Sequence, residues 1–151
     1  MIYADHAATT KISETAKLAM LSAMEKDWYN PSSLYTPGQQ ASGTLMDARV
    51  RIAHCLGCLP KEIYFTSGGS EADNQAILSA AAIGKRQGKM HIISTAFEHH
   101  AVLHTLKKLE KEGFEITLLD VGEKGIVSPA QVEKAIRPDT ALVTVMYANN
   151  E

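Results

Sequence analysis

The chain of 151 residues is long enough for one compact domain, and its 45% hydrophobic and 21% charged residues are typical of a soluble protein. The net charge is -2 and the sequence contains no basic stripe. Both features argue against a nucleic-acid or membrane partner. No apolar run approaches the roughly 20 residues needed to cross a bilayer, and no signal peptide is visible, so we expect a cytoplasmic protein.

Two helices are predicted in the N-terminal part of the chain. The apolar face of the first consists of Ala16, Ala19, Met20, Ala23 and Met24. The face of the second consists of Ala41, Leu45, Ala48 and Ile52. Gly57 follows the second as a stop signal, and Asn30-Pro31-Ser32-Ser33 between the helices is typical of a turn. We therefore expect residues 1–58 to form an N-terminal arm with helices.

Strand-like and helical segments alternate from residue 59 to residue 151. The predicted strands are Glu62–Thr66, His91–Thr95, Glu115–Leu119 and Thr140–Met146. The last is nearly continuous and apolar, which is typical of a strand covered on both faces. Such alternation favours right-handed βαβ units, so the fold class is α/β with a parallel-sheet βαβ core.

Three helices are predicted between these strands. Apolar residues recur at helical spacing in the first two: Ala72, Ala76, Ile77, Ala80 and Ala81, and then Val102, Leu103, Leu106 and Leu109. Gly113 is a stop signal for the second. The third is expected to begin at Ser128, whose side chain can cap the helix while Gln131 reaches back to the cap.

Polar segments follow the predicted strands at 67–71, 97–100 and 147–151, and should meet at the carboxyl edge of the sheet, where ligands bind. The first, Ser67-Gly68-Gly69-Ser70-Glu71, opens a helix with small residues and a hydroxyl, so a phosphate would fit there. The alternative is an ordinary turn capped by Ser67 or Ser70. The segment is neither a P-loop nor the dinucleotide fingerprint.

The other two polar segments could act on a bound ligand. His99 could place its imidazole over a ring or near a reacting proton, and the alternative is a helix-start histidine facing solvent. His100 is the more ordinary surface residue of the pair. Segment 147–151 offers amide and carboxylate groups, and the alternative is a polar loop after a buried strand.

The only two cysteines, Cys55 and Cys58, form a C-x-x-C at the C-terminus of a predicted helix. That end of the helix dipole does not lower a thiol pKa, and two ligands cannot complete a tetrahedral zinc site. We therefore interpret them as buried or incidental thiols and predict no metal site.

Five segments share their order and spacing with one known family: 3–10 (YADHAATT), 30–33 (NPSS), 65–74 (FTSGGSEADN), 98–99 (EH) and 148–151 (ANNE). They resemble the cysteine desulfurases of the NifS/IscS group, which belong to the aminotransferase class V, fold-type I superfamily of pyridoxal-phosphate enzymes. The resemblance implies that residues 1–151 form the N-terminal portion of the large domain of such a transferase. It also implies that segments 5–10 and 30–33 border the active site.

The resemblance assigns cofactor roles to four residues of this sequence. Gly69 and Ser70 stand where the family binds the phosphate of pyridoxal 5'-phosphate. His99 stands where a histidine stacks on the pyridine ring and assists proton transfer, and Asn150 where an asparagine hydrogen-bonds the phenolic oxygen. Ser70 is often threonine in relatives, which keeps the hydroxyl.

The complete protein is expected to convert L-cysteine to L-alanine and to pass persulfide sulfur to an acceptor or scaffold protein for iron–sulfur clusters or thio-cofactors. The lysine that bonds the cofactor and the cysteine that carries the persulfide follow Glu151 in the family, so we expect this truncated chain to be inactive alone and to bind the cofactor weakly. We also expect a homodimer or larger oligomer. The alternatives are another class V enzyme, such as a selenocysteine lyase or an aminotransferase, and a non-catalytic assembly or binding fragment.

Overall fold

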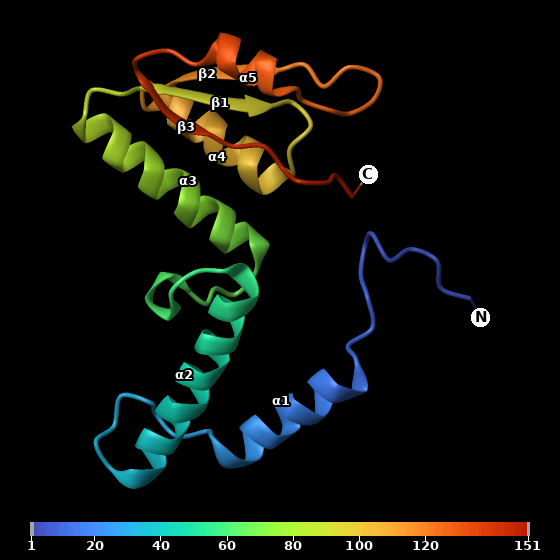
Figure 1. The fold of residues 1–151 in the computed structure, drawn as a ribbon, viewed down its shortest axis with the longest axis vertical. Coiled ribbons are helices and arrows are strands. Elements are labelled where there is room, and N and C mark those ends of the chain that lie inside the picture. Colours follow the sequence, from blue (N-terminus) through green and yellow to red (C-terminus); the bar gives the residue numbers. More distant parts are fainter. Residues whose placement is uncertain (1, 151) are drawn as a thin grey trace. The chain divides into compact units, whose positions relative to one another are not determined.

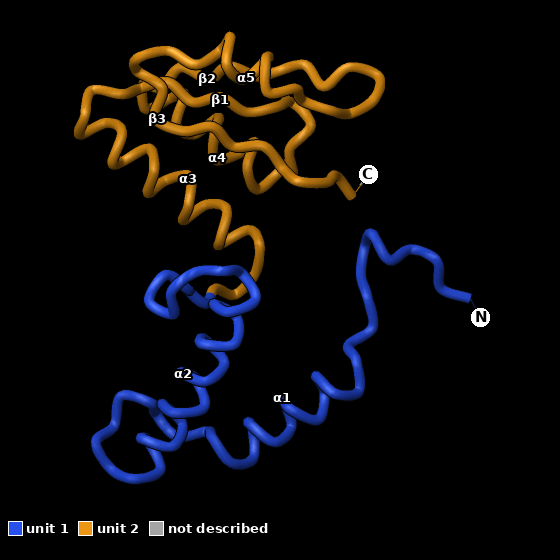
Figure 2. The backbone as a smooth tube through the Cα atoms, viewed as in Figure 1, with its two compact units in different colours: residues 1–65 blue, residues 66–151 orange. Residues whose placement is uncertain are grey.

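The computed structural model describes residues 2–150, which form two compact units with a boundary between Phe65 and Thr66 (Figure 2). Each unit is described by itself. None of the helices in residues 2–150 is long and apolar enough to cross a membrane. Glu151, the last residue of the third polar segment, lies outside the described residues.

The first unit contains helices α1 (Glu14–Lys26) and α2 (Thr36–Leu56) (Figure 1). Ser13 caps α1 by accepting a hydrogen bond from the backbone N–H of Ala16 at 3.2 Å. Gly57 ends α2 in the left-handed region at φ 67°, as predicted for a stop signal. The expected apolar faces are mostly exposed, because α1 has no buried residue and α2 buries only Gly38, Ala41 and Ala53.

The strand predicted at Glu62–Thr66 is wrong. Glu62 instead ends a short 3-10 helix, η1 (Pro60–Glu62), and its carboxylate accepts a hydrogen bond from the backbone N–H of Leu59 at 2.7 Å. Ile63 has extended backbone angles, but no strand of residues 2–150 runs beside it. The guanidinium of Arg49 donates to the carbonyl of Ile63, so a side chain occupies the acceptor that a neighbouring strand would use.

The second unit is a three-stranded parallel sheet with the order β2-β1-β3, which confirms the α/β fold class. Strands β1 (His91–Thr95) and β2 (Glu115–Leu119) have the predicted bounds. Strand β3 (Thr140–Val143) is three residues shorter than predicted. It lies at an edge of the sheet, and three of its four residues are only partly buried, so the prediction of a strand covered on both faces is wrong for β3. The strand with every side chain buried is the central one, β1.

Helices α3 (Gly69–Arg86) and α4 (His100–Lys111) pack on one face of this sheet, and Figure 1 shows α5 (Pro129–Ala135) on the other. The core joins α3, α4 and β1 through seven buried residues: Ile77, Ala81, Ile92, Val102, Leu106, Leu109 and Phe114. Gly113 follows α4 with φ 96°, and Ser128 and Gln131 form the predicted capping box of α5.

The close packing of α3 on β3 depends on Gly84. A Cβ atom at this position would lie 2.4 Å from the Cβ of Ala141 and 3.0 Å from the carbonyl oxygen of Lys89. Both distances are shorter than van der Waals contact allows, so a side chain at residue 84 would force α3 away from the strand.

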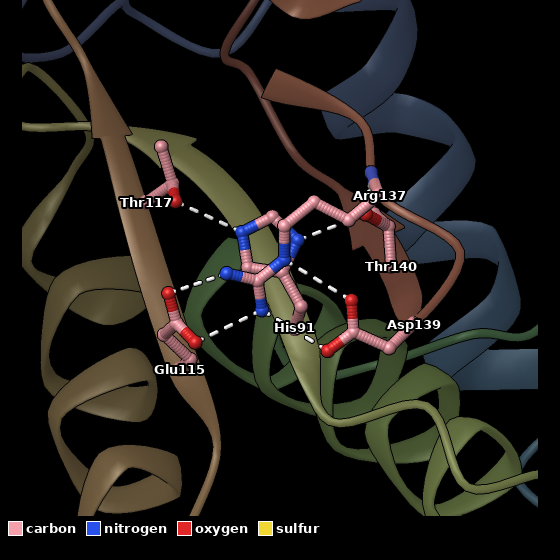
Figure 3. A network of polar contacts seen from close by, with 6 residues as sticks. All are labelled: His91, Glu115, Thr117, Arg137, Asp139 and Thr140. Carbon is pink, nitrogen blue, oxygen red and sulfur yellow. Dashed lines mark hydrogen bonds and ion pairs between the residues drawn. The ribbon is translucent and has the colours of Figure 1, made fainter.

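The amino edge of the sheet carries a polar network around His91, which is fully buried (Figure 3). Its two ring nitrogens lie 2.8 Å from the hydroxyls of Thr117 and Thr140, one on each neighbouring strand. Arg137 pairs with the carboxylates of Glu115 and Asp139 beside the ring. Burial, and secondly the charge of Arg137, lower the pKa of His91.

The core predicts a contrast between two isoleucines of α3. Ile77 is 3% exposed and lies in the core, whereas Ile83 is 56% exposed. Ile77→Ala should lower the free energy of unfolding by about 2–5 kcal/mol, and Ile83→Ala by less than about 1 kcal/mol. Urea denaturation followed by circular dichroism measures both. Equal losses in the two variants would contradict the packing described.

The His91 network predicts that the free energy of unfolding decreases as the pH is lowered below about 6.5. Because the folded pKa of His91 is below 6.5, the unfolded chain binds more protons as the pH falls. The stabilisation is complete above about pH 6.5 and should decrease below it, which urea denaturation between pH 7 and pH 5 measures. In His91→Gln the free energy of unfolding should depend less on pH between pH 7 and pH 5. A wild-type stability that rises between pH 7 and pH 5 would contradict the prediction.

Candidate functional site

The structure brings the three polar segments together at the carboxyl edge of the sheet, within the second unit. Ser70 and His99 line one open hollow of about 380 Å³ beside the first turns of α3 and α4. His99 and Asn150 line a second hollow of about 40 Å³. His99 lines both hollows, so Ser70, His99 and Asn150 lie around two neighbouring hollows at this edge of the sheet.

The first turn of α3 has free hydrogen-bond donors. Neither Ser67 nor Ser70 caps this helix, so the alternative of a serine-capped turn is wrong. The backbone N–H and hydroxyl of Ser67 donate instead to the carboxylate of Glu71, at 2.6 and 2.7 Å, and these bonds lower the pKa of Glu71. Within residues 2–150 no acceptor faces the backbone N–H groups of Gly69 and Ser70.

These free donors fit a phosphate group. The backbone N–H groups point out of a helix N-terminus, and the hydroxyl of Ser70 is exposed beside them. A Cβ atom placed on Gly68 or Gly69 would meet no other atom within 4 Å, so the space above the turn is open to a ligand.

His99 is held at the start of α4 by its own ring. Its Nδ1 atom accepts a hydrogen bond from the backbone N–H of Ala101 at 3.1 Å, so the ring caps the helix. The neutral imidazole therefore carries its proton on Nε2. The side chain is exposed, as the solvent-facing alternative also predicts, but it lies beside Ser70 and Asn150 rather than alone on a surface.

Asn74 joins the two helix starts that carry Ser70 and His99. Its amide Nδ2 donates to the carbonyl of Ser70 at 2.7 Å and to the carbonyl of Ala101 at 3.4 Å. Its Oδ1 accepts from the hydroxyl of Thr105 at 2.6 Å. This bridge between α3 and α4 was missed in the sequence, where only the position of Asn74 one turn after Ser70 on the same helix hinted at it.

Glu98 and Asn149 join the turn before α4 to the segment after β3. The Oε1 atom of Glu98 accepts from the backbone N–H of Met146 at 2.8 Å, and Nδ2 of Asn149 donates to the carbonyl of Phe97 at 2.7 Å. Both residues line the smaller hollow with His99 and Asn150. Sequence reasoning placed them in polar segments without predicting that they pair these segments.

The remaining predicted features lie elsewhere. Cys55 is exposed in the last turn of α2, and Cys58 is partly exposed beyond Gly57, so neither thiol is buried. No cluster of three or more histidine, cysteine or acidic side chains in residues 2–150 could hold a metal ion. Segments 5–10 and 30–33 lie in the first unit, and their place beside the active site stays a prediction.

Comparison with known proteins identifies the family to which the chain belongs. Residues 2–151 match the aminotransferase class-V family. The chain belongs to that family. It is 50% identical over 150 residues to the putative cysteine desulfurase IscS 1 of Bacillus subtilis strain 168, and 47% identical to the cysteine desulfurase IscS of Methanosarcina thermophila. The resemblance seen in the motifs is thereby confirmed.

Several solved structures share the fold of this chain. A NifS-like protein superposes with a TM-score of 0.92 at 35% identity, and SspA in complex with cysteine with a TM-score of 0.91 at 38% identity. These matches cover 97% and 99% of this chain, but 40% and 43% of the solved chains. The two curated relatives are matched over 99% of this chain and over 39% and 37% of their own length. The chain therefore spans about two fifths of its class-V relatives.

The bridge made by Asn74 predicts measurable coupling between α3 and α4. Asn74→Ala should lower the free energy of unfolding by about 1–3 kcal/mol, because it leaves partly buried polar groups without partners. A double-mutant cycle with Thr105→Val should give a coupling energy of about 0.5 kcal/mol or more. Gln75→Ala, at an exposed amide on the same helix, is the control and should be nearly neutral. Strictly additive effects of the Asn74 and Thr105 changes would exclude the bridge.

Proposed function

We propose that this chain supplies one part of the pyridoxal 5'-phosphate site of a cysteine desulfurase, which converts L-cysteine to L-alanine and retains the sulfur as a persulfide. The observation that carries the proposal is the single hollow lined by Ser70 and His99 at the uncapped start of α3. The desulfurase names of relatives at 47–50% identity support it.

The donor groups of the site match the parts of this cofactor. Gly69 and Ser70 would hold the phosphate through two backbone N–H groups and a hydroxyl. The ring of His99 would lie against the pyridine, and the amide of Asn150 would donate to the phenolic oxygen. When bound, the cofactor supplies an electron-withdrawing ring to the substrate, while the protein orients it.

His99 also has a defined proton position. Because Nδ1 is engaged by the helix start, Nε2 is the atom that can give up or accept a proton on the ligand side. The alternatives within class V, a selenocysteine lyase or an aminotransferase, would use the same phosphate and ring contacts. They differ in substrate, so activity with L-cysteine decides between them.

We further propose that the protein acts in the cytoplasm as a homodimer or larger oligomer and delivers sulfur to an acceptor protein. Exposed apolar side chains in both units support association: examples are Trp28 at 68%, Leu34 at 91% and Ile126 at 66% exposed. Light scattering tests this, and a clean monomer at high concentration would contradict it.

The desulfurase proposal predicts activity of the full-length protein. Loaded with pyridoxal 5'-phosphate, it should release equal amounts of L-alanine and sulfur from L-cysteine, with sulfur released as sulfide in the presence of a thiol. Ser70→Ala should weaken cofactor affinity about tenfold or more, since a hydrogen bond to a charged group contributes about 1.5–3 kcal/mol. Ser79→Ala, exposed on the same helix, is the control. Turnover of selenocysteine or of an amino-group acceptor, with none of L-cysteine, would refute the proposal.

The 151-residue chain itself should bind the cofactor weakly. A few charge-assisted hydrogen bonds of about 1.5–3 kcal/mol each are offset by association costs of about 4–15 kcal/mol, which leaves a dissociation constant near millimolar at best. Titration with pyridoxal 5'-phosphate, followed by borohydride reduction and mass spectrometry, measures this. Tight stoichiometric binding, or reduction onto a single lysine, would show that the chain alone forms a complete site.

A further inference from the structure

Glu98 is the only buried acidic side chain of residues 2–150, at 7% exposed. Burial of an ionised carboxylate costs several kcal/mol unless other groups compensate for the lost water. The ion pairs of the described residues involve other carboxylates, so no cation neutralises Glu98 there. Its compensation comes from two hydrogen-bond donors, the backbone N–H of Met146 and the hydroxyl of Thr95 at 3.2 Å.

These two bonds lie beyond the end of the ladder between β1 and β3. The ladder between β1 and β3 ends at Ile93 and Val143, with one further bond from the backbone N–H of Thr144 to the carbonyl of Ile93. After that point, side chains connect the turn before α4 to residues 146–150. Glu98 provides one connection, to Met146, and Asn149 provides another, to Phe97.

Both proposed cofactor-contacting groups follow these connections directly. His99 is the residue after Glu98, and Asn150 is the residue after Asn149. Glu98, His99 and Asn150 line the same hollow of about 40 Å³. The separation between the imidazole and the amide is therefore set by both connections, that of Glu98 to Met146 and that of Asn149 to Phe97.

Stability alone does not account for a carboxylate in this place. An apolar side chain of similar volume at a buried position is commonly as stabilising as a buried charge, or more so. An apolar side chain could not accept the N–H of Met146, however, and the segment that ends in Asn150 would lose one of its two attachments to the turn.

We propose that Glu98 is a positioning residue whose buried carboxylate fixes the spacing between His99 and Asn150, so that both contact the same bound ring. The inference rests on the proposed function. Glu98 acts through the backbone of Met146 and through its neighbour His99, without touching the substrate itself.

The test uses the full-length protein loaded with pyridoxal 5'-phosphate and compares Glu98→Gln with Glu98→Met. Glutamine keeps an oxygen that can accept from Met146 and Thr95, whereas methionine has similar length and no comparable acceptor. Glu98→Gln should keep the wild-type visible absorbance of the cofactor and a kcat within about threefold. Glu98→Met should shift that absorbance and lower kcat about 10- to 100-fold, with KM for L-cysteine changed less than about threefold.

Thr117→Val is the matched control, because it removes a hydrogen bond of the His91 network at the opposite edge of the sheet. It should lower the melting temperature without changing the cofactor absorbance. If Glu98→Met does not fold, Thr95→Val takes its place, since it removes the second donor to Glu98 and should give a smaller shift of the same absorbance band.

Two results would overturn the inference. The first is a wild-type spectrum and kcat in Glu98→Met or, if that variant does not fold, a wild-type spectrum in Thr95→Val. The second is a loss in Glu98→Gln as large as the loss in Glu98→Met. The second result would mean that the negative charge matters rather than the position of the acceptor. Failure of the proposed function looks different. In that case the wild-type protein has no activity with L-cysteine, while the absorbance of the bound cofactor still reports the effect of Glu98.

Discussion

The complete burial of the central strand β1 constrains most of the second unit. Three of its five buried side chains are polar, and each polar group in a water-free interior requires a partner. His91 finds two threonine hydroxyls at the amino edge of the sheet, and Thr95 finds Glu98 at the carboxyl edge. Only the hydroxyl of Ser94, the fourth of the five residues of this strand, has no hydrogen-bond partner among the described residues.

The polar residues at the two ends of β1 therefore have different surroundings at the two edges of the sheet. At the amino edge, hydrogen bonds of His91 and ion pairs of Arg137 connect residues on or beside the three strands. At the carboxyl edge, the first turn of α3 and the start of α4 at His99 and His100 stay exposed. Ser70 and the ring of His99 line the same hollow there. A parallel sheet brings such residues together because all its strands end on the same side.

Local sequence signals predicted most of the elements correctly. Helical spacing located α3 and α4, Gly57 and Gly113 marked helix ends, and the Ser128 capping box marked the start of α5. These features depend on residues within one or two turns of each other. The expectation that Ser70, His99 and Asn150 lie at the same edge of the sheet followed from the alternation of strands and helices, while their roles stay a prediction.

Features that depend on distant partners were missed or misplaced. The segment Glu62–Thr66 has the apolar residues of a strand, but a ladder needs a neighbouring backbone, and none runs beside it in residues 2–150. The pairings of Asn74 with Ala101 and of Glu98 with Met146 span 27 and 48 positions. No local pattern encodes such pairs, since each residue alone resembles an ordinary polar surface residue.

The contact of Gly84 with Ala141 affects the site from the far end of α3. The helix has 18 residues and is therefore about 27 Å long, with Gly84 near one end and Ser70 at the other. A rigid helix that is pushed at one end tilts about its core contacts, so its other end moves as well. A few tenths of an ångström of extra separation at Gly84 would thus also displace the Ser70 hydroxyl relative to His99. The orientation of the first turn of α3 therefore depends on the absence of a side chain at residue 84, near the other end of the same helix.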